Sequence, residues 1–267
     1  MFFVSNPYLA VLKIYIKDVF AYKVDLTLST LFNILKPLLL IFVFYAVYQF
    51  SNVSTLKGIT LSSIVVYFFV VGNLDFIVAP TNIVKHMQND IKEGSIATEL
   101  IRPINYIFMP FLSVIPADII LFAFTTIPLL ILLYLITGIH LNIFIIIAFA
   151  IGVLIAYLIS NLLSFIIGSF SIYLVDVSGI GEGILWINEI LGGGIIPIIF
   201  YPKIISNLLM LTPFPFMIFV PAGIFIGIIN TNIVNILITG IVWVIILALI
   251  SKIVWKRVSK DMNVVGV

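Results

Sequence analysis

Long apolar stretches, separated by short clusters of charged residues, dominate the pattern along the chain. Each stretch reaches or approaches the roughly 20 residues that a helix needs to cross about 30 Å of hydrocarbon. The pattern therefore predicts an all-α polytopic membrane protein with six transmembrane helices. We place these helices at residues 31-50, 59-78, 109-137, 142-173, 184-201 and 232-254.

The composition agrees with a membrane protein. Of 267 residues, 63% are hydrophobic and 9% are charged, whereas a soluble domain carries about a quarter charged residues. This scarcity of charge argues against a soluble globular, disordered or nucleic-acid-binding protein. The chain has no Cys, which excludes disulfides, thiolate metal sites and Cys nucleophiles.

The positions of the basic residues predict the direction of the spans. If the N-terminus is cytoplasmic and the chain crosses six times, 11 of the 13 Lys and Arg residues fall on the cytoplasmic side. Only Lys57 and Lys203 fall outside. Because Lys and Arg are retained preferentially in cytoplasmic segments, we predict that both termini are cytoplasmic.

The first segment, residues 1-30, differs from a cleavable signal peptide because Lys and Asp residues interrupt every short apolar run. Asn6-Pro7 is typical of a helix start. Aromatic and aliphatic residues then mix with charges, which favours a helix lying in the cytoplasmic interface. The alternative is a disordered basic tail. Residues 31-267 form the second unit, one membrane domain.

Catalytic and nucleotide-binding motifs are missing. No Gly is followed by Lys, so the phosphate-cradling G-x-x-x-x-G-K-[ST] loop is absent. The predicted topology puts His86 and His140 on opposite sides of the membrane, where they cannot share a metal. We therefore expect a protein that is not an enzyme, with no cofactor or metal in this chain.

Three acidic residues fall within the predicted spans: Asp75, Asp118 and Glu189. An ionisable side chain in hydrocarbon implies a partner or a role. Asp75 and Glu189 lie near the predicted cytoplasmic boundary, where an acid stays wet. Asp118 lies deeper and follows Pro116, so it is either a structural residue paired with a neighbouring helix or part of a proton or cation relay.

The only sizeable cytoplasmic loop is predicted at residues 79-108. Gly94 stops a first helix in the left-handed conformation, Ser95 caps a further turn, and Arg102-Pro103 ends it. Apolar residues in a solvated loop have no obvious purpose unless they bind something. This elbow therefore favours docking to a soluble partner, with a merely solvated loop as the alternative.

A second irregular segment runs from Trp186 to Gly227 and is rich in Pro and Gly. These residues cannot form one straight helix, and irregular backbone at membrane depth must be covered by protein or line a water-filled cavity. We expect the fifth span to end near Tyr201. Short external, re-entrant-like helices then occupy residues 202-230 between spans five and six. The alternative is a Pro-rich surface loop.

These two segments resemble the ABC-2 type transporter permeases, and in particular their six-span branch. The elbow matches the family pattern I-x-x-G-x-x-x-x-x-L-x-R-P through Ile91, Gly94, Leu100, Arg102 and Pro103. The later segment is similar to the second signature of that branch. The elbow departs from the family pattern in one respect, because the family often has an acid shortly after the motif Gly, whereas Ser95-Ile96-Ala97 follows Gly94 in this chain.

The resemblance implies the membrane subunit of an ATP-driven exporter in a prokaryotic plasma membrane. Its partners would be separate ABC ATPase subunits, which bind ATP and Mg, a second permease copy or paralogue, and the lipid bilayer that surrounds the permeases, without nucleic acid. The elbow would be a coupling helix. The implied coupling residues are Lys85, Ile91, Lys92, Glu93, Gly94, Leu100, Arg102 and Pro103. The implied external gate residues are Gly194, Pro197, Phe200, Pro202, Pro213, Phe214 and Pro221.

We expect ATP binding to move the elbows and to change the gap between the first, second and fifth spans. A path lined by Phe, Tyr and Ile favours a hydrophobic or amphipathic cargo such as a peptide, drug or lipid. Two other functions fit the sequence. One is an autonomous secondary transporter or channel that uses Asp118. The other is a non-transporting membrane scaffold or immunity subunit.

Overall fold

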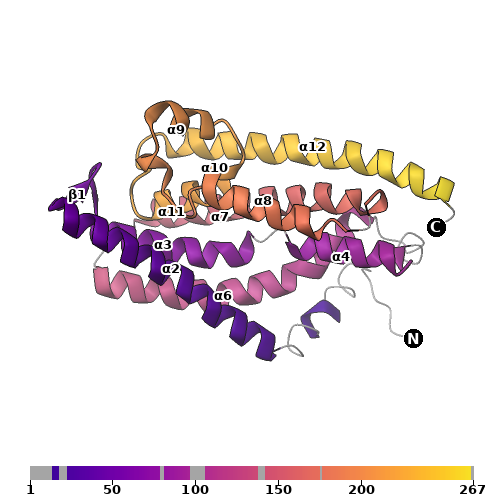
Figure 1. The fold of residues 1–267 in the computed structure, drawn as a ribbon, viewed down its shortest axis with the longest axis horizontal. Coiled ribbons are helices and arrows are strands. Elements are labelled where there is room, and N and C mark those ends of the chain that lie inside the picture. The colour runs from indigo at the N-terminus through magenta and orange to yellow at the C-terminus, as the bar shows by residue number, and fades with distance from the viewer. Residues whose placement is uncertain are drawn as a thin grey trace.

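The computed structural model describes residues 14–17, 23–78, 81–96, 106–137, 142–174 and 176–265. These residues are almost entirely helical, and the long helices run roughly along the longest axis of the molecule (Figure 1). The long helices are α2 (Lys23–Ser51), α3 (Leu61–Ile77), α4 (Thr81–Lys92), α6 (Met109–Thr137), α7 (Ile143–Ser169), α8 (Ser178–Leu191) and α12 (Ile233–Val265). The short elements are α9 (Lys203–Leu209), α10 (Phe214–Met217), α11 (Phe219–Phe225), η1 (Tyr106–Phe108), η2 (Phe170–Ile172) and η3 (Ile198–Phe200).

Each predicted span overlaps a helix, but several ends were wrong. Helix α2 begins at Lys23, so no break separates a first unit at residue 30 from the first span. Helix α8 ends at Leu191, because three consecutive glycines follow, and it does not reach Tyr201. Helix α12 continues to Val265, well beyond its predicted end at residue 254. Of the predicted interfacial segment, residues 1-30, the structure describes a helical piece at 14–17 and the start of α2; the rest lies outside the described residues.

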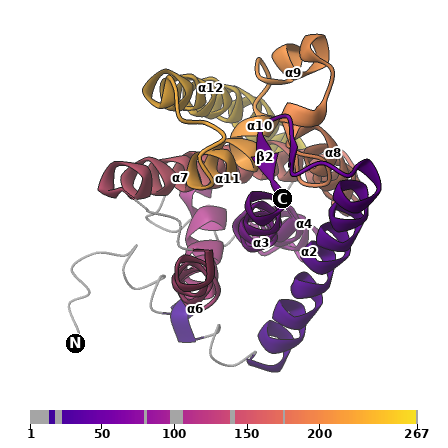
Figure 2. The same ribbon diagram turned by 90° about the vertical axis from the view of Figure 1, so that its left-hand side faces the viewer.

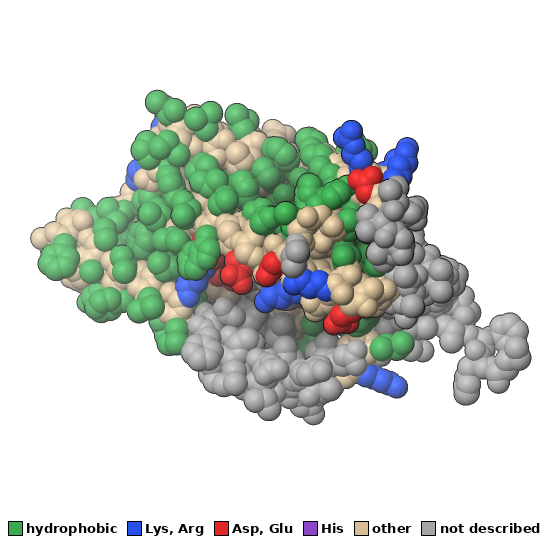
Figure 3. Space-filling model, turned by 45° about the vertical axis from the view of Figure 1, so that its right-hand side comes forward, with side chains coloured by type: hydrophobic (Ala, Val, Ile, Leu, Met, Phe, Trp, Pro, Cys, Tyr) green, Lys and Arg blue, Asp and Glu red, His purple; other side chains and the backbone are tan. Residues whose placement is uncertain are grey.

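Two helical stretches of the described chain are both long and apolar enough to cross a bilayer, Ile143–Ile172 and Ile233–Asp261. Shorter apolar helices cover Leu35–Ser51, Leu61–Asp75 and Tyr106–Ile120. Large hydrophobic side chains are exposed along these helices. In Figure 3, hydrophobic side chains cover much of one end of the visible face, whereas charged ones gather from its middle to the other end. An apolar surface of this extent suits lipid or a protein partner.

Helix α7 is the centre of the fold. It packs against α12, α4, α10 and α11, and Figure 2 shows α7 between α12 and α6 when the bundle is seen end-on. Every residue of α11 is buried, and Gly152 of α7 lets Pro221 of α11 approach closely. The Pro-rich segment is therefore not a loop on the surface of this chain, since α10 and α11 form part of its core.

A second, smaller core lies at the end of the molecule near α4. It joins four helices through buried apolar residues: Ile83 and Met87 of α4, Val114 of α6, Phe165 of α7, and Trp255 and Val258 of α12. We call this group the elbow cluster. It fixes α4 to three of the long helices.

A short β-hairpin connects α2 to α3, which an all-α prediction misses. Strands β1 (Thr55–Leu56) and β2 (Ile59–Thr60) pair in antiparallel register. Lys57 and Gly58 have φ values of 49° and 83°, as a two-residue hairpin turn requires at both central positions. Thr60 then caps α3 by accepting a hydrogen bond from the Ser63 amide at 3.2 Å.

Candidate charged site and elbow helix

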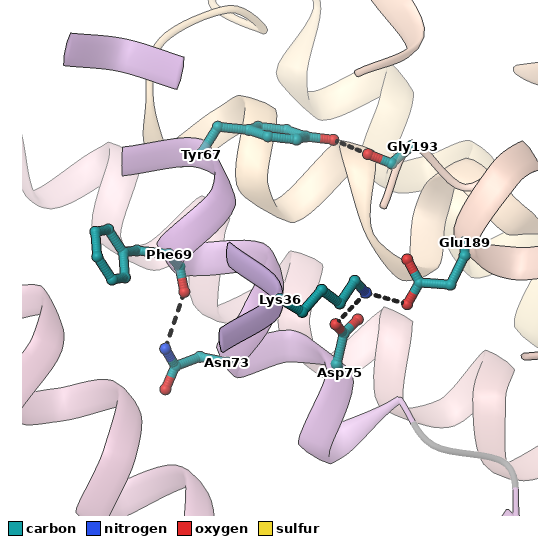
Figure 4. A network of polar contacts seen from close by, with 7 residues as sticks. All are labelled: Lys36, Tyr67, Phe69, Asn73, Asp75, Glu189 and Gly193. Atoms are coloured by element: carbon teal, nitrogen blue, oxygen red, sulfur yellow. Dashed lines mark hydrogen bonds and ion pairs between the residues drawn. The ribbon is translucent and has the colours of Figure 1, made fainter. Parts of the chain in front are cut away.

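Three charged side chains from three helices meet at one point. The Lys36 Nζ of α2 donates to Asp75 Oδ2 of α3 at 2.6 Å and also to Glu189 Oε1 of α8 (Figure 4). The side chains of Asp75 and Glu189 are only 16% and 13% exposed, whereas that of Lys36 is 34% exposed. We call Lys36, Asp75 and Glu189 the charged triad. It ties together three helices that the sequence separates widely.

Two of the glycines after α8 shape this site. The Gly193 carbonyl accepts a hydrogen bond from the buried Tyr67 hydroxyl at 2.7 Å. The φ of Gly193 is 93°, a conformation that side chains other than Gly rarely adopt. A Cβ on Gly194 would overlap Glu189 Oε2. The glycine run therefore ends α8 and also leaves room for the Glu189 carboxylate beside the backbone.

The charges of the triad are unequal, because one ammonium faces two carboxylates. The second Glu189 oxygen, Oε2, is buried and has no hydrogen-bond partner among the described residues. A buried polar atom without a partner costs free energy comparable to a lost hydrogen bond. This atom therefore calls for an explanation beyond the ion pairs themselves.

Sequence reasoning selected Asp75 and Glu189 separately and missed their partner. Lys36 was one of the 11 basic residues assigned to the cytoplasmic side, although it falls inside the predicted first span, residues 31-50. Since α2 begins at Lys23, Lys36 lies about 20 Å along the helix from its start. A Lys next to the uninterrupted apolar run of 37-48 was the signal that could have identified it.

Asp118 lies elsewhere in the fold. It is on α6, is 7% exposed, and faces the Tyr157 hydroxyl of α7 closely enough to interact with it. No hydrogen bond of normal geometry joins that hydroxyl to another described residue. Asp118 thus lies beside a neighbouring helix and is not part of the charged triad.

The elbow is an amphipathic helix whose apolar side faces its own chain. In α4, Ile83, Val84 and Met87 are almost fully buried. Met87 packs so closely on Gly168 of α7 that an added Cβ there would lie 2.7 Å from its sulfur. The Gln88 side chain accepts a hydrogen bond from the Val177 amide at 2.8 Å. Helix α4 is therefore joined rigidly to α7 and to the start of α8.

The other side of α4 is polar and exposed. Lys85, Lys92 and Glu93 lie on it. Gly94 follows with a φ of 72°, so the predicted left-handed helix stop is confirmed. Ile91 is half-buried against the elbow cluster.

The predicted apolar docking surface is thus used largely inside the chain, since Ile96 is also buried, at 1% exposure. The remaining predicted coupling residues, Leu100, Arg102 and Pro103, lie outside the described residues.

The predicted gate residues occupy the connections between short helices. Pro202 precedes α9 and Pro213 precedes α10, where a fixed φ and a missing amide donor suit a helix start. Pro197 is buried before η3, and the Phe200 ring lies 5.5 Å from that of Phe44 in α2. Phe214 is half-buried against the main core. These residues pack the segment onto the bundle.

No group of three His, Cys, Asp or Glu side chains within the described chain has the arrangement of a metal site. The triad holds an ammonium where a metal would need an oxygen or nitrogen ligand. Its chemistry is therefore that of an ion pair.

Apolar helices with apolar outer faces, around the charged triad, point to an integral membrane protein. The chain belongs to the ABC-2 transporter family, because a family model described as "ABC-2 family transporter protein" matches residues 32–266. A search of curated proteins finds no match. Family membership makes the chain a permease of an ABC transporter and implies that it pairs with an ABC ATPase in a membrane complex.

Proposed function

We propose that this chain is the membrane subunit of an ATP-driven exporter, with six spans, both termini in the cytoplasm, and the elbow as its ATPase contact. The observation that carries the proposal is α4 itself. Its apolar side is bound to α7 and α8, and its polar side, with Lys85, Lys92 and Glu93, is exposed. A helix held firmly on one side and polar on the other is suited to pass a partner's movement to the spans.

The placement of the basic residues supports this orientation. The elbow and the C-terminal end of α12 lie at the same end of the molecule (Figure 1), and this end carries Lys252, Lys256, Arg257 and Lys260. The hairpin with Lys57 and the helix α9 with Lys203 lie toward the opposite end. An end rich in Lys and Arg is the expected cytoplasmic one.

The helix assigned to the fifth span, α8, is too short to cross the membrane without the irregular segment that follows it. Helix α8 has 14 residues and measures about 21 Å, which is less than the roughly 30 Å of hydrocarbon. The buried helices α10 and α11 pack against α7 and against α8 or α3. We infer that α8 and this segment together cross the membrane, with the Pro-rich helices re-entering from outside. In this arrangement ATP and Mg bind to the partner, and this chain catalyses no reaction.

The cargo we propose is hydrophobic or amphipathic. Helix α2 exposes Leu39 and Phe42 at 67% and 70%, and α8 exposes Trp186 at 66%. These faces would contact lipid or a second permease subunit. The charged triad lies between these faces and is the only cluster of ion pairs linking long helices in the described chain. A translocation path formed by these helices would therefore be mostly apolar.

Co-purification with the cognate ATPase tests the proposal. The double variant Lys85→Glu/Lys92→Glu reverses two exposed charges on α4 and should reduce recovery of the ATPase at least tenfold, with unchanged thermal stability. The control Lys203→Glu reverses an exposed charge at the opposite end and should retain the complex. Equal recovery from both variants would refute α4 as the contact.

Reconstitution into liposomes separates the alternatives. An exporter subunit moves cargo only with the ATPase and ATP. A secondary transporter that uses Asp118 would show ion-gradient-driven flux without ATP, and Asp118→Asn would abolish it. A scaffold or immunity subunit would keep the complex and show no flux.

A further inference from the structure

The charged triad joins α2, α3 and α8, the helices assigned above to the first, second and fifth spans. If all three groups were ionised, the site would carry one uncompensated negative charge. Burying such a charge is costly, and in proteins the group usually neutralises instead. The two carboxylates also lie close enough to interact with each other, and adjacent carboxylates resist being ionised together.

The two carboxylate oxygens of Glu189 differ in their hydrogen-bond partners. One oxygen, Oε1, accepts from Lys36. The other, Oε2, is buried and without a partner among the described residues. A hydrogen on one carboxyl group would let that group donate to the other carboxylate. The repulsion between the two acids would then become a charge-assisted hydrogen bond.

Neighbouring hydroxyl groups do not supply this hydrogen. The phenol of Tyr67 on α3 lies near both acids, and the phenol of Tyr201, after η3, lies near Tyr67. The Tyr67 hydroxyl donates to the Gly193 carbonyl at 2.7 Å, and the Tyr201 hydroxyl donates to the Ile190 carbonyl at 2.8 Å. Each hydroxyl has one hydrogen, so both are already committed.

A larger cation does not fit at the unpartnered oxygen. Glu189 Oε2 is inaccessible, and even one added carbon on Gly194 would overlap it. A metal ion would also require several oxygen ligands at one centre. A proton needs no additional space and balances the charge.

We propose that Asp75 and Glu189 share one exchangeable proton, so that the triad is neutral when α2, α3 and α8 are packed together. Lys36 is one-third exposed and marks the side from which the proton exchanges. Separation of α2 from the two acids would remove the ammonium, and a second proton would then be required. Proton occupancy is therefore coupled to the spacing of these three helices.

Infrared difference spectroscopy of the purified chain in lipid, titrated with acid and base, tests this proposal. A protonated carboxyl group has a C=O stretch well separated from the carboxylate bands. The wild type should show such a band, and both Asp75→Asn and Glu189→Gln should lose it. Either substitution leaves a single carboxylate balanced by Lys36, which has no need of a proton.

Two further variants make the test specific. Asp118→Asn removes the other buried acid and should keep the band assigned to the triad. Lys36→Met removes the ammonium and should increase the band, because no positive charge in the triad then balances either carboxylate. The proposal is overturned if the wild type lacks the band, or if the band survives in Glu189→Gln and Asp75→Asn. The experiment requires no ATPase, so its result is independent of the proposed function.

Discussion

Trp255 of α12 is the side chain on which the elbow cluster depends most. It is 7% exposed, stacks on Tyr106 with ring centroids 4.8 Å apart, and contacts the Phe165 ring at 5.6 Å. The Tyr106 hydroxyl in turn donates to Asp90 of α4 at 3.0 Å. Trp255 therefore connects α12 to α4 through a single intervening residue.

The substitution Trp255→Ala should be strongly destabilising. Removing a buried Trp from a core costs about 3–5 kcal/mol, part of it from two aromatic pairs worth about 0.5–1.5 kcal/mol each. For a protein of this size, a loss of that magnitude lowers the melting temperature by about 10 °C. Trp255→Phe keeps a ring against Tyr106, and we expect it to lose less than half as much.

Thermal unfolding of the purified protein in one detergent measures this difference. Trp186→Ala is the matched control, since Trp186 is 66% exposed on α8 and its loss should change the melting temperature by no more than a few degrees. Similar melting temperatures for Trp255→Ala and Trp186→Ala would refute the role of the elbow cluster in stability.

Three other predictions concern separate parts of the fold. Gly193→Ala should destabilise the protein by at least about 1 kcal/mol, because the φ of Gly193 is 93° and the added Cβ would lie 3.0 Å from the buried Tyr67 hydroxyl of α3. Gly183→Ala has open space around its Cβ and should not destabilise the protein. Melting curves of the two variants measure this difference. Lys57→Met removes the ammonium that donates to two carbonyls at η3 and just after it, so hydrogen exchange there should accelerate, whereas Lys203→Met should leave it unchanged. The Asp176 carboxylate accepts from the hydroxyl and amide of the serine that begins α8, which lowers the pKa of Asp176 below 3.8. A carboxylate whose pKa is lowered in the folded state stabilises that state at pH values above its unfolded-state pKa. This stabilisation is lost as the pH falls through the folded-state pKa. Amide protection of the first turn of α8 should therefore decrease on acidification below about pH 4 and be insensitive to acid in Asp176→Ala.

The helices were predictable where a long apolar run contains few polar residues. The prediction for α6, residues 109-137, coincides with the helix. The ends failed where charge or glycine was misinterpreted. Lys23 and Asp25 were assigned to an interfacial segment although they belong to α2. Hydropathy finds apolar length, but a helix continues through polar residues once its ends extend beyond the hydrocarbon.

The charged triad could be predicted only in part. An acid within an apolar run is visible in the sequence, and both Asp75 and Glu189 were selected on that ground. Their meeting depends on how α3 and α8 pack, and no spacing rule connects residues that are 114 positions apart. The burial of α4 was similarly hidden, because the same apolar residues suit a partner's surface or the chain's own core.

The elbow and the charged triad are connected through α8. The first half of α8 packs on α4, where Gly181 contacts Val84, and its last turn carries Glu189 to Lys36 of α2. Helix α3 provides a second connection, since Asp75 lies at its end and α4 begins at Thr81. In the function proposed above, a partner that displaces α4 would therefore act on the triad by two routes, one through packing and one along the backbone. Because α2 has no such connection to α4 among the described helix pairs in close contact, the force falls on the ion pairs of Lys36, where α2 meets the other two helices.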